Sequence, residues 1–192
     1  MAEKRLVVAI TGASGSVYAV RFIESVLEHF DRIYLTVTEN AAYVIREELE
    51  IDSQALFGKY GEKVEVLSPN DLAAAPSSGS VKTDGMVIIP CSMGTAGRIA
   101  SGISSDLVTR AADVCLKEGR KLIMVVRETP FNLIHLRNLT ALAEAGATIL
   151  PASPAFYSHP KTVEDMVSFV VARVMQQLNL EQTLIPEWEK PK

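Results

Sequence analysis

Two turns of small and hydroxyl-bearing residues each follow a short apolar run, and both could bind an anion. Residues 11–16 read Thr-Gly-Ala-Ser-Gly-Ser, and residues 90–95 read Pro-Cys-Ser-Met-Gly-Thr. Small residues let the backbone turn and direct free N–H groups at a phosphate. Neither turn matches G-x-G-x-x-G or G-x-x-x-x-G-K-[ST], so tight packing of a helix on a strand is the alternative. Two such turns at one sheet edge fit a phosphorylated planar ligand.

A residue that could bind a ribose follows the second apolar run. Dinucleotide folds place an acidic side chain there, and Glu39 is a candidate. However, Thr38 comes first, and a carboxylate at position 39 also suits the first turn of the next helix. The pattern therefore favours a helix-stabilising role for Glu39 over ribose binding.

Three cations could bind a phosphate. Arg110 and Lys117 are seven residues apart, which on a helix is two turns and about 10.5 Å along one face. Asp106 and Asp113 precede them by four residues, so a ladder of ion pairs on a solvated face is an equal alternative. Arg127 directly follows a strand, at the sheet edge where open α/β folds bind ligands, although it could instead pair with a neighbour such as Glu128.

Other candidate groups come from a loop and two helices. Tyr157 lies in a proline-rich loop and Arg173 flanks the apolar stripe of the last helix, with plain packing as the alternative for the tyrosine. Glu47, Glu48 and Glu50 end the second helix, and solvated surface is their default interpretation. A carboxylate of this group that faced a pocket would instead be a proton-transfer candidate whose pKa rises on burial.

The elements that position these groups alternate between strands and helices. Strands are predicted at residues 6–11, 33–38, 86–90, 121–126 and 147–150, and helices at 17–29, 39–49, 105–117, 132–145 and 163–178. This alternation predicts an α/β three-layer sandwich with a mostly parallel, doubly wound sheet. Residues 68–83 are predicted to form a functional loop with at most one short helix.

The composition favours one globular domain and excludes several function classes. The 192 residues predict a domain at 1–183 and a C-terminal arm at 184–192 that contains Trp188. A net charge of −4 argues against nucleic-acid binding, and no apolar run could span a membrane. Two cysteines and three histidines without ligand spacing predict no metal and a cytoplasmic location. The mean hydropathy of +0.18 hints at a homo-oligomer.

Five ordered motifs resemble one known family. They are residues 10–15 (ITGASG), 90–93 (PCSM), 107–114 (LVTRAADV), 126–130 (VRETP) and 154–157 (PAFY). The chain resembles the UbiX family, flavin prenyltransferases that were formerly described as aromatic-acid decarboxylases. The likeness extends from about Leu6 to Leu178, and five motifs in order are far more specific than any single one.

The resemblance implies a flavodoxin-like or Rossmann-like sandwich that binds reduced FMN between subunits. It implies transfer of a dimethylallyl group from dimethylallyl phosphate to flavin N5, with loss of phosphate, and a second bond to C6, all without a metal. The product would be prenylated FMN, the cofactor of a UbiD-type decarboxylase. Homo-oligomers, commonly dodecamers, are implied as well, while the size of the oligomer and a monophosphate or diphosphate donor remain open.

The resemblance also assigns site residues by motif. The implied FMN ligands are Gly12, Ala13, Ser14, Thr38, Ser92, Met93, Gly94, Thr95 and Arg127. The implied ligands of the allylic phosphate are Arg110, Lys117, Tyr157 and Arg173, whose charge would replace Mg²⁺ as the phosphate leaves. Ser14, Lys117 and a proton-transferring glutamate would be catalytic. That glutamate is Glu48 by counting from Thr38, with Glu50 as the alternative, and Trp188 could stabilise charge on the allyl group.

The chain departs from the family pattern at one turn, and other functions are possible. The family turn often reads Pro-Cys-Ser-x-Lys-Thr, whereas Gly94 stands in the lysine position, which puts only a minor FMN contact in doubt. The rivals are an FMN-dependent cysteine decarboxylase, a non-catalytic flavin carrier and an NAD-dependent oxidoreductase. Neither the catalytic histidine nor the P-x-x-x-N-x loop of the cysteine decarboxylases is found in the expected places.

Overall fold

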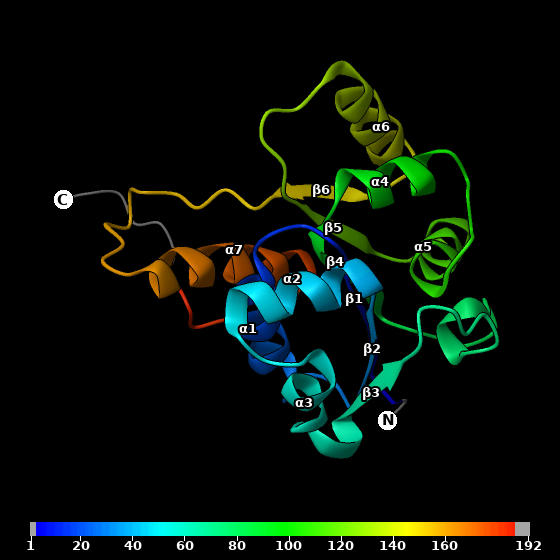
Figure 1. The fold of residues 1–192 in the computed structure, drawn as a ribbon, viewed down its shortest axis with the longest axis horizontal. Coiled ribbons are helices and arrows are strands. Elements are labelled where there is room, and N and C mark those ends of the chain that lie inside the picture. Colours follow the sequence, from blue (N-terminus) through cyan, green and yellow to red (C-terminus); the bar gives the residue numbers. More distant parts are fainter. Residues whose placement is uncertain (1–2, 187–192) are drawn as a thin grey trace.

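Six parallel strands form a single sheet in the centre of the protein (Figure 1). The structure is a computed structural model that describes residues 3–186. The strands are β1 (Arg5–Ile10), β2 (Arg32–Val37), β3 (Val64–Leu67), β4 (Gly85–Cys91), β5 (Leu122–Val126) and β6 (Thr148–Pro151). Their order in the sheet is β3-β2-β1-β4-β5-β6, which is the doubly wound order of the Rossmann fold.

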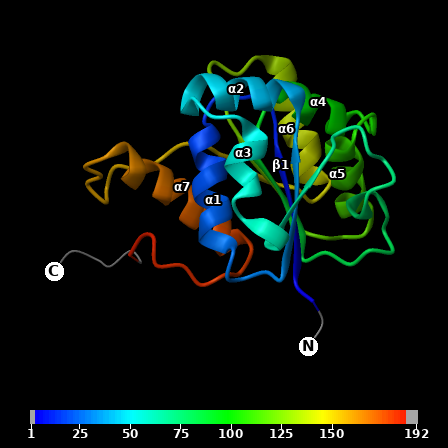
Figure 2. The same ribbon diagram turned by 60° about the horizontal axis from the view of Figure 1, so that its bottom comes forward.

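Helices cover both faces of this sheet. They are α1 (Ser16–Val26), α2 (Glu39–Leu49), α3 (Ser53–Gly58), α4 (Met93–Ala100), α5 (Leu107–Lys117), α6 (Leu133–Glu144) and α7 (Val163–Gln177). Buried side chains of α1, α2, α3 and α7 pack on one face, and those of α4, α5 and α6 on the other (Figures 1 and 2). The predicted three-layer α/β sandwich is confirmed.

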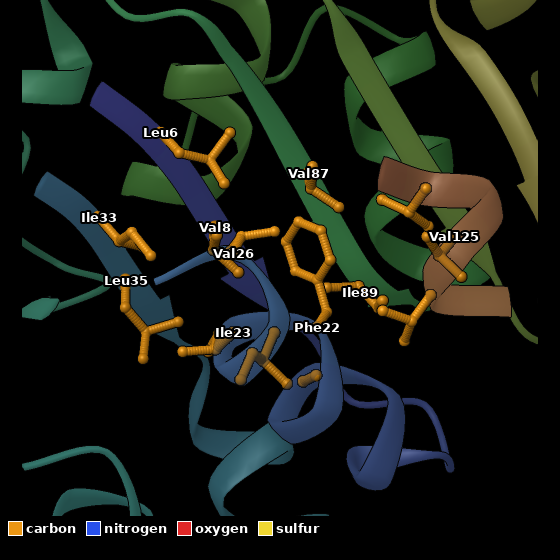
Figure 3. Close-up of a cluster of buried hydrophobic side chains, with 14 of the residues drawn as sticks. Leu6, Val8, Phe22, Ile23, Val26, Ile33, Leu35, Val87, Ile89 and Val125 are labelled. Carbon is orange, nitrogen blue, oxygen red and sulfur yellow. The ribbon is translucent and has the colours of Figure 1, made fainter. Parts of the chain in front are cut away.

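The core explains why the first strand is a continuous apolar run. Leu6 and Val8 point to the α1 side, where Phe22 of α1 lies (Figure 3), and Ile10 belongs to the same apolar cluster. Val7 and Ala9 belong to the second apolar cluster, under α4 and α5. Because successive side chains of a strand point to opposite faces, a sheet that is covered on both sides has no polar alternation.

The strand order creates a crevice at the carboxyl ends of β1 and β4. The chain leaves β1 through α1 toward β2, whereas it leaves β4 through α4 and α5 toward β5. Connections that diverge from adjacent parallel strands leave a gap at the sheet edge, which is where open α/β folds bind ligands. The turns at residues 11–16 and 90–95 both lie at this point.

Three elements were not predicted, each for a local reason. Strand β3 has four residues at the sheet edge, with Val64 buried and Val66 exposed, so its apolar signal is weak. Helix α3 has six residues, and α4 begins inside a glycine-containing segment that was interpreted only as a turn. The loop at 68–83 contains one short 3₁₀ helix, Ala75–Ser77, as expected.

The last described residues return to the main body. Leu184 packs on the α1-side core, and Gln182 and Ile185 exchange two hydrogen bonds of 3.0 Å. Trp188, a candidate from the sequence, lies outside the described residues. Within residues 3–186, no helix combines the length and apolar character that crossing a bilayer requires.

Candidate functional site

Thr11 joins the two small-residue turns. Its hydroxyl donates to the carbonyl of Pro90 (2.9 Å) and accepts from the backbone N–H of Ser92 (2.8 Å). The Thr11 N–H also donates to Pro90 O at 3.2 Å, and the side chain is buried. A buried hydroxyl that is fully satisfied fixes the groups it joins, so the turns after β1 and β4 form one rigid wall.

Two helices begin at this wall with hydroxyl caps. Thr38 caps α2 by accepting from Ala41 N at 3.2 Å, and Ser92 caps α4 by accepting from Thr95 N at 3.3 Å. The first N–H groups of each helix have no partner within the helix, and the helix dipole adds partial positive charge there. Two helix N-termini therefore face the same crevice, which suits an anion.

A cavity of about 520 Å³ occupies the crevice, within the size range of small-molecule sites. Its lining residues are Gly12, Thr38, Glu39, Asn40, Pro69, Asn70, Ser92, Gly94, Thr95, Arg98 and Asp106. A Cβ on Gly12 would lie 2.6 Å from Asn40 Cβ, so only glycine permits this close approach. A Cβ on Gly94 would meet nothing within 4 Å, because that residue faces open space. The cavity is polar and has no aromatic wall.

Glu48 lies at the other side of the first turn. Its carboxylate accepts from Gly15 N at 2.9 and 3.0 Å and from Ser16 N at 2.7 Å, at the start of α1. Gly15 has a φ of 107°, a conformation that favours glycine. This geometry favours Glu48 over Glu50 as the candidate for proton transfer. Glu50 is the C-cap residue of α2 and has a left-handed backbone conformation.

The pKa of Glu48 departs from the prediction. Partial burial raises it, but hydrogen bonds from Ser14 and from the N–H groups of Gly15 and Ser16 outweigh that effect and hold the pKa below its usual range. The predicted rise on burial was wrong because donors at a helix N-terminus stabilise the charged form. The side chain is therefore a carboxylate at neutral pH.

Arg127 reaches the same turn from β5. Its Nε donates to Ser14 O at 3.1 Å, and its backbone N–H donates to Cys91 O at 3.2 Å. Arg127 also lies near Tyr18, whose pKa is raised by burial and lowered in part by this guanidinium. Arg127 thus joins β4, β5 and the first turn. The alternative of an ion pair with Glu128 does not hold.

The two cations of α5 lie elsewhere in this chain. Arg110 donates to Asp113 Oδ2 (2.8 Å) and Ser77 O (3.0 Å), while Lys117 pairs with Glu118 at 2.6 Å. The alternative of a ladder of four-residue ion pairs does not hold, because Asp106 pairs with Arg98 of α4 instead. Neither cation lines the cavity.

Tyr157 and Arg173 belong to a different region. Arg173 lines a second cavity of about 260 Å³ between β6 and α7, and its Nη1 donates to Gln176 Oε1 at 2.6 Å. Phe169 lines that cavity too, and its ring meets the Tyr157 ring edge-on at 6.0 Å. The segment at 152–162, which contains Tyr157, extends away from the rest of the chain (Figures 1 and 2). One chain alone does not bring these groups to the first cavity.

The comparisons with known proteins agree over nearly the whole chain. The Flavoprotein family model matches residues 1–175. The flavin prenyltransferase UbiX of Alkalihalophilus pseudofirmus is 45% identical, over 97% of this chain and 96% of that protein. The chain belongs to the flavoprotein family, among the UbiX flavin prenyltransferases.

Solved structures of UbiX relatives have the same fold. The crystal structure of AnUbiX (PadA1) in complex with FMN and dimethylallyl pyrophosphate is 36% identical, covers 100% of both chains and has a TM-score of 0.93. A dodecameric FMN-dependent UbiX-like decarboxylase from Escherichia coli O157:H7 is 41% identical, covers 97% of this chain and 100% of that one, and has a TM-score of 0.91. The peptidyl-cysteine decarboxylase EpiD shares only the fold, at 16% identity and a TM-score of 0.63 over 93% of this chain and 99% of its own.

Within this UbiX site, sequence reasoning missed several lining residues. They are Asn40, Pro69, Asn70, Arg98 and Asp106. The loop at 68–83 was predicted to be functional, but the sequence did not indicate that its Pro69 and Asn70 line this cavity. Asp106 is the N-cap of α5, with its side chain accepting from Thr109 N at 2.8 Å, and this local signal hid its place in the cavity.

The two cysteines are buried, and neither is among the residues that line the cavity. Burial raises the pKa of Cys91 to about 12 and that of Cys115 to about 11. A thiol with such a pKa is neutral and unreactive at physiological pH. No cluster of three or more His, Cys, Asp or Glu residues in the described part of the chain could hold a metal ion.

Proposed function

We propose that this protein joins a dimethylallyl group from dimethylallyl phosphate to N5 and C6 of reduced FMN, giving prenylated FMN. The observation that carries the proposal is the position of the ionised Glu48, fixed at the turn that also borders a polar, anion-directed cavity. The UbiX relatives described above support the same reaction.

FMN fits the site on structural grounds. Two helix N-termini and three hydroxyl side chains, Thr38, Ser92 and Thr95, line the cavity and can bind the phosphate. Gly12 permits close approach of the backbone and Gly94 leaves room beside α4. Ala13, Ser14, Met93 and Arg127 would complete the contacts with the rest of FMN, whose reduced ring supplies the nucleophilic positions.

Glu48 and Ser14 would move the proton. The Glu48 carboxylate is ionised at neutral pH and can accept a proton, while the donors that lower its pKa fix its position and make it a weaker base. Formation of a bond at C6 requires that a proton leave that carbon. The Ser14 hydroxyl is hydrogen-bonded to this carboxylate and would orient it. Because Arg127 donates to Ser14 O, the acceptor on α2 is positioned by the turn after β1, the start of α1 and the residue that follows β5.

The leaving phosphate would be bound by Arg110, Lys117, Tyr157 and Arg173, with Lys117 acting directly on it. Fixed positive charge stabilises the anion that forms as the C–O bond breaks, so no metal is required. Since Tyr157 and Arg173 lie beside a separate cavity of their own chain, we propose that the complete site forms between copies of the protein.

Exposed apolar side chains support a homo-oligomer. Leu133, Ile134 and Leu136 of α6 are 60, 67 and 49% exposed, and Phe156, next to Tyr157, is 67% exposed. Apolar surface of this kind commonly marks an interface. The similarity to a dodecameric relative fits this proposal. We also propose that the protein acts in the cytoplasm and passes its product to a UbiD-type decarboxylase.

An anaerobic incubation of the purified protein with reduced FMN and dimethylallyl phosphate tests the reaction. Mass spectrometry of the extracted flavin should show the gain of one C5H8 unit. A parallel reaction with dimethylallyl diphosphate identifies the preferred donor. Unchanged FMN with both donors would refute prenyl transfer, and an FMN that stays bound would then favour the flavin-carrier alternative.

A further inference from the structure

Arg98 introduces a cation into the cavity that no motif assigned. It lies four residues after Gly94 on α4, so the two residues share one helix face, and both line the cavity. Its charge also reaches the end of β4, where it acts to lower the pKa of buried Cys91.

One edge of this guanidinium is held by protein groups. Nη1 pairs with Asp106, the mostly buried N-cap of α5, and lies 3.5 Å from Ser105 Oγ, while Nη2 is 3.4 Å from Thr95 Oγ1. The Nε–H has no acceptor within the described residues, and Nη2 has a second hydrogen. Because a guanidinium offers five donors in a planar fork, Asp106 can hold one edge while the other binds an oxyanion.

Negative charge on the cavity wall would repel a phosphate unless a cation offset it. Glu39 and Asp106 both line the cavity, so without Arg98 a phosphate would face two carboxylates. The two helix N-termini offer only about half a unit of positive charge each. Among residues 3–186, Arg98 is the only Lys or Arg that lines the cavity.

The lining also indicates which part of FMN would occupy this cavity. Its walls are glycine, hydroxyl, amide and charged groups, with no aromatic side chain to stack on a flavin ring. A phosphorylated ribityl chain matches such walls, whereas an isoalloxazine ring does not. The ring would lie toward Glu48 and Arg127, at the other side of the first turn.

We propose that Arg98 binds the 5′-phosphate of FMN and that Asp106 orients its guanidinium for this contact. The inference rests on the proposed function, because it assumes that FMN is the ligand. It adds a specificity residue: Arg98 would make the site select FMN over riboflavin, which lacks the phosphate.

Flavin-binding titrations of the full-length protein test this role. FMN and riboflavin are each titrated into the wild-type protein, Arg98→Ala, Arg98→Lys and the control Arg46→Ala, an exposed arginine at the far end of α2. Loss of a charge-assisted hydrogen bond predicts a roughly 10- to 100-fold weaker affinity of Arg98→Ala for FMN. Its affinity for riboflavin should stay the same. Arg98→Lys should fall between these values, and Arg46→Ala should match the wild type.

A second measurement covers the case in which Arg98→Ala does not fold. The FMN affinity of the wild type should fall as KCl rises from low to high concentration, and Arg98→Gln should reduce that salt dependence. Equal losses for FMN and riboflavin, or no loss for either, would overturn the role of Arg98 and leave prenyl transfer intact. A wild-type protein that binds neither flavin would instead refute the proposed function, and this inference with it.

Discussion

Replacement of Glu48 by glutamine separates its catalytic role from its structural one. The carboxylate accepts three N–H contacts of 2.7–3.0 Å from Gly15 and Ser16, at the positive end of α1. Glutamine keeps one acceptor oxygen and loses the charge. Glu50→Gln is the matched control, because it makes the same chemical change two residues away, at a helix end where no donor to its carboxylate is found among residues 3–186.

The expected loss of stability is small and depends on pH. A charge at an exposed helix N-terminus contributes about 0.3–1 kcal/mol, and solvent screening reduces the hydrogen-bond part, so Glu48→Gln should cost about 1 kcal/mol at pH 7. The folded-state pKa of Glu48 lies below its ordinary value of 4.5, so this stabilisation is present above the unfolded pKa. It is lost as pH falls through the folded pKa, and the two unfolding curves should then converge.

The catalytic effect should be much larger than the structural one. Loss of a positioned proton acceptor predicts a fall in the prenylation rate of about 10²- to 10⁴-fold. FMN affinity should change little, because Glu48 is not among the residues that line the cavity. Urea unfolding at fixed protein concentration, FMN titration and initial-rate kinetics measure the three quantities. A Glu48→Gln enzyme with wild-type turnover, or a Glu50→Gln enzyme that lost more, would refute the assignment.

Three further predictions follow from other parts of the site. Gly12→Ala should lose bound flavin and about 1–3 kcal/mol of stability, because its Cβ would lie 2.6 Å from Asn40 Cβ. The control Gly58→Ala, which has open space around it, should keep both flavin and stability. Flavin absorbance measures the bound flavin, and thermal unfolding measures the stability. Cys91 and Cys115, whose pKa values burial raises to about 12 and 11, should resist iodoacetamide at pH 8 in the native protein and react after unfolding, as mass spectrometry would show. Arg173→Ala and Glu48→Gln should each be inactive alone. If the site is shared between subunits, subunits of the two variants that assemble together should regain activity. Mixtures that stayed inactive despite verified co-assembly would place both residues in one subunit's site.

The sequence predicted those parts of the molecule that depend on local patterns. The apolar runs located five of the six strands, and the helix predicted at residues 39–49 matches α2. Counting from Thr38 under the family resemblance selects Glu48, and its catalytic role stays a prediction. The strand and helix predictions succeeded because strand burial and helix caps depend on residues that are near one another in the sequence.

The partners of charged side chains could not be predicted in the same way. Spacing on α5 paired Asp106 with Arg110, but Asp106 binds Arg98 of the preceding helix, because the turn between α4 and α5 brings the end of one helix to the start of the next. Helical spacing describes neighbours on one helix only. The predicted rise of the Glu48 pKa was wrong for the same reason. The donors that lower this pKa lie at the start of α1, more than thirty residues away in the sequence.

The strand order bears on which subunit supplies the proposed ligands of the leaving phosphate. The groups that depend on β1, β2, β4 and β5 converge on one sheet edge because the parallel order places their carboxyl ends together. Tyr157 follows β6 at the outer edge of the sheet, and Arg173 lies on α7, whose cavity opens beside β6. Strand order thus separates Glu48, the proposed proton acceptor, from Tyr157 and Arg173, two of the proposed phosphate ligands, within one chain. The proposed reaction needs both, so we expect a second copy to supply the phosphate ligands, and the subunit-mixing experiment measures that requirement directly.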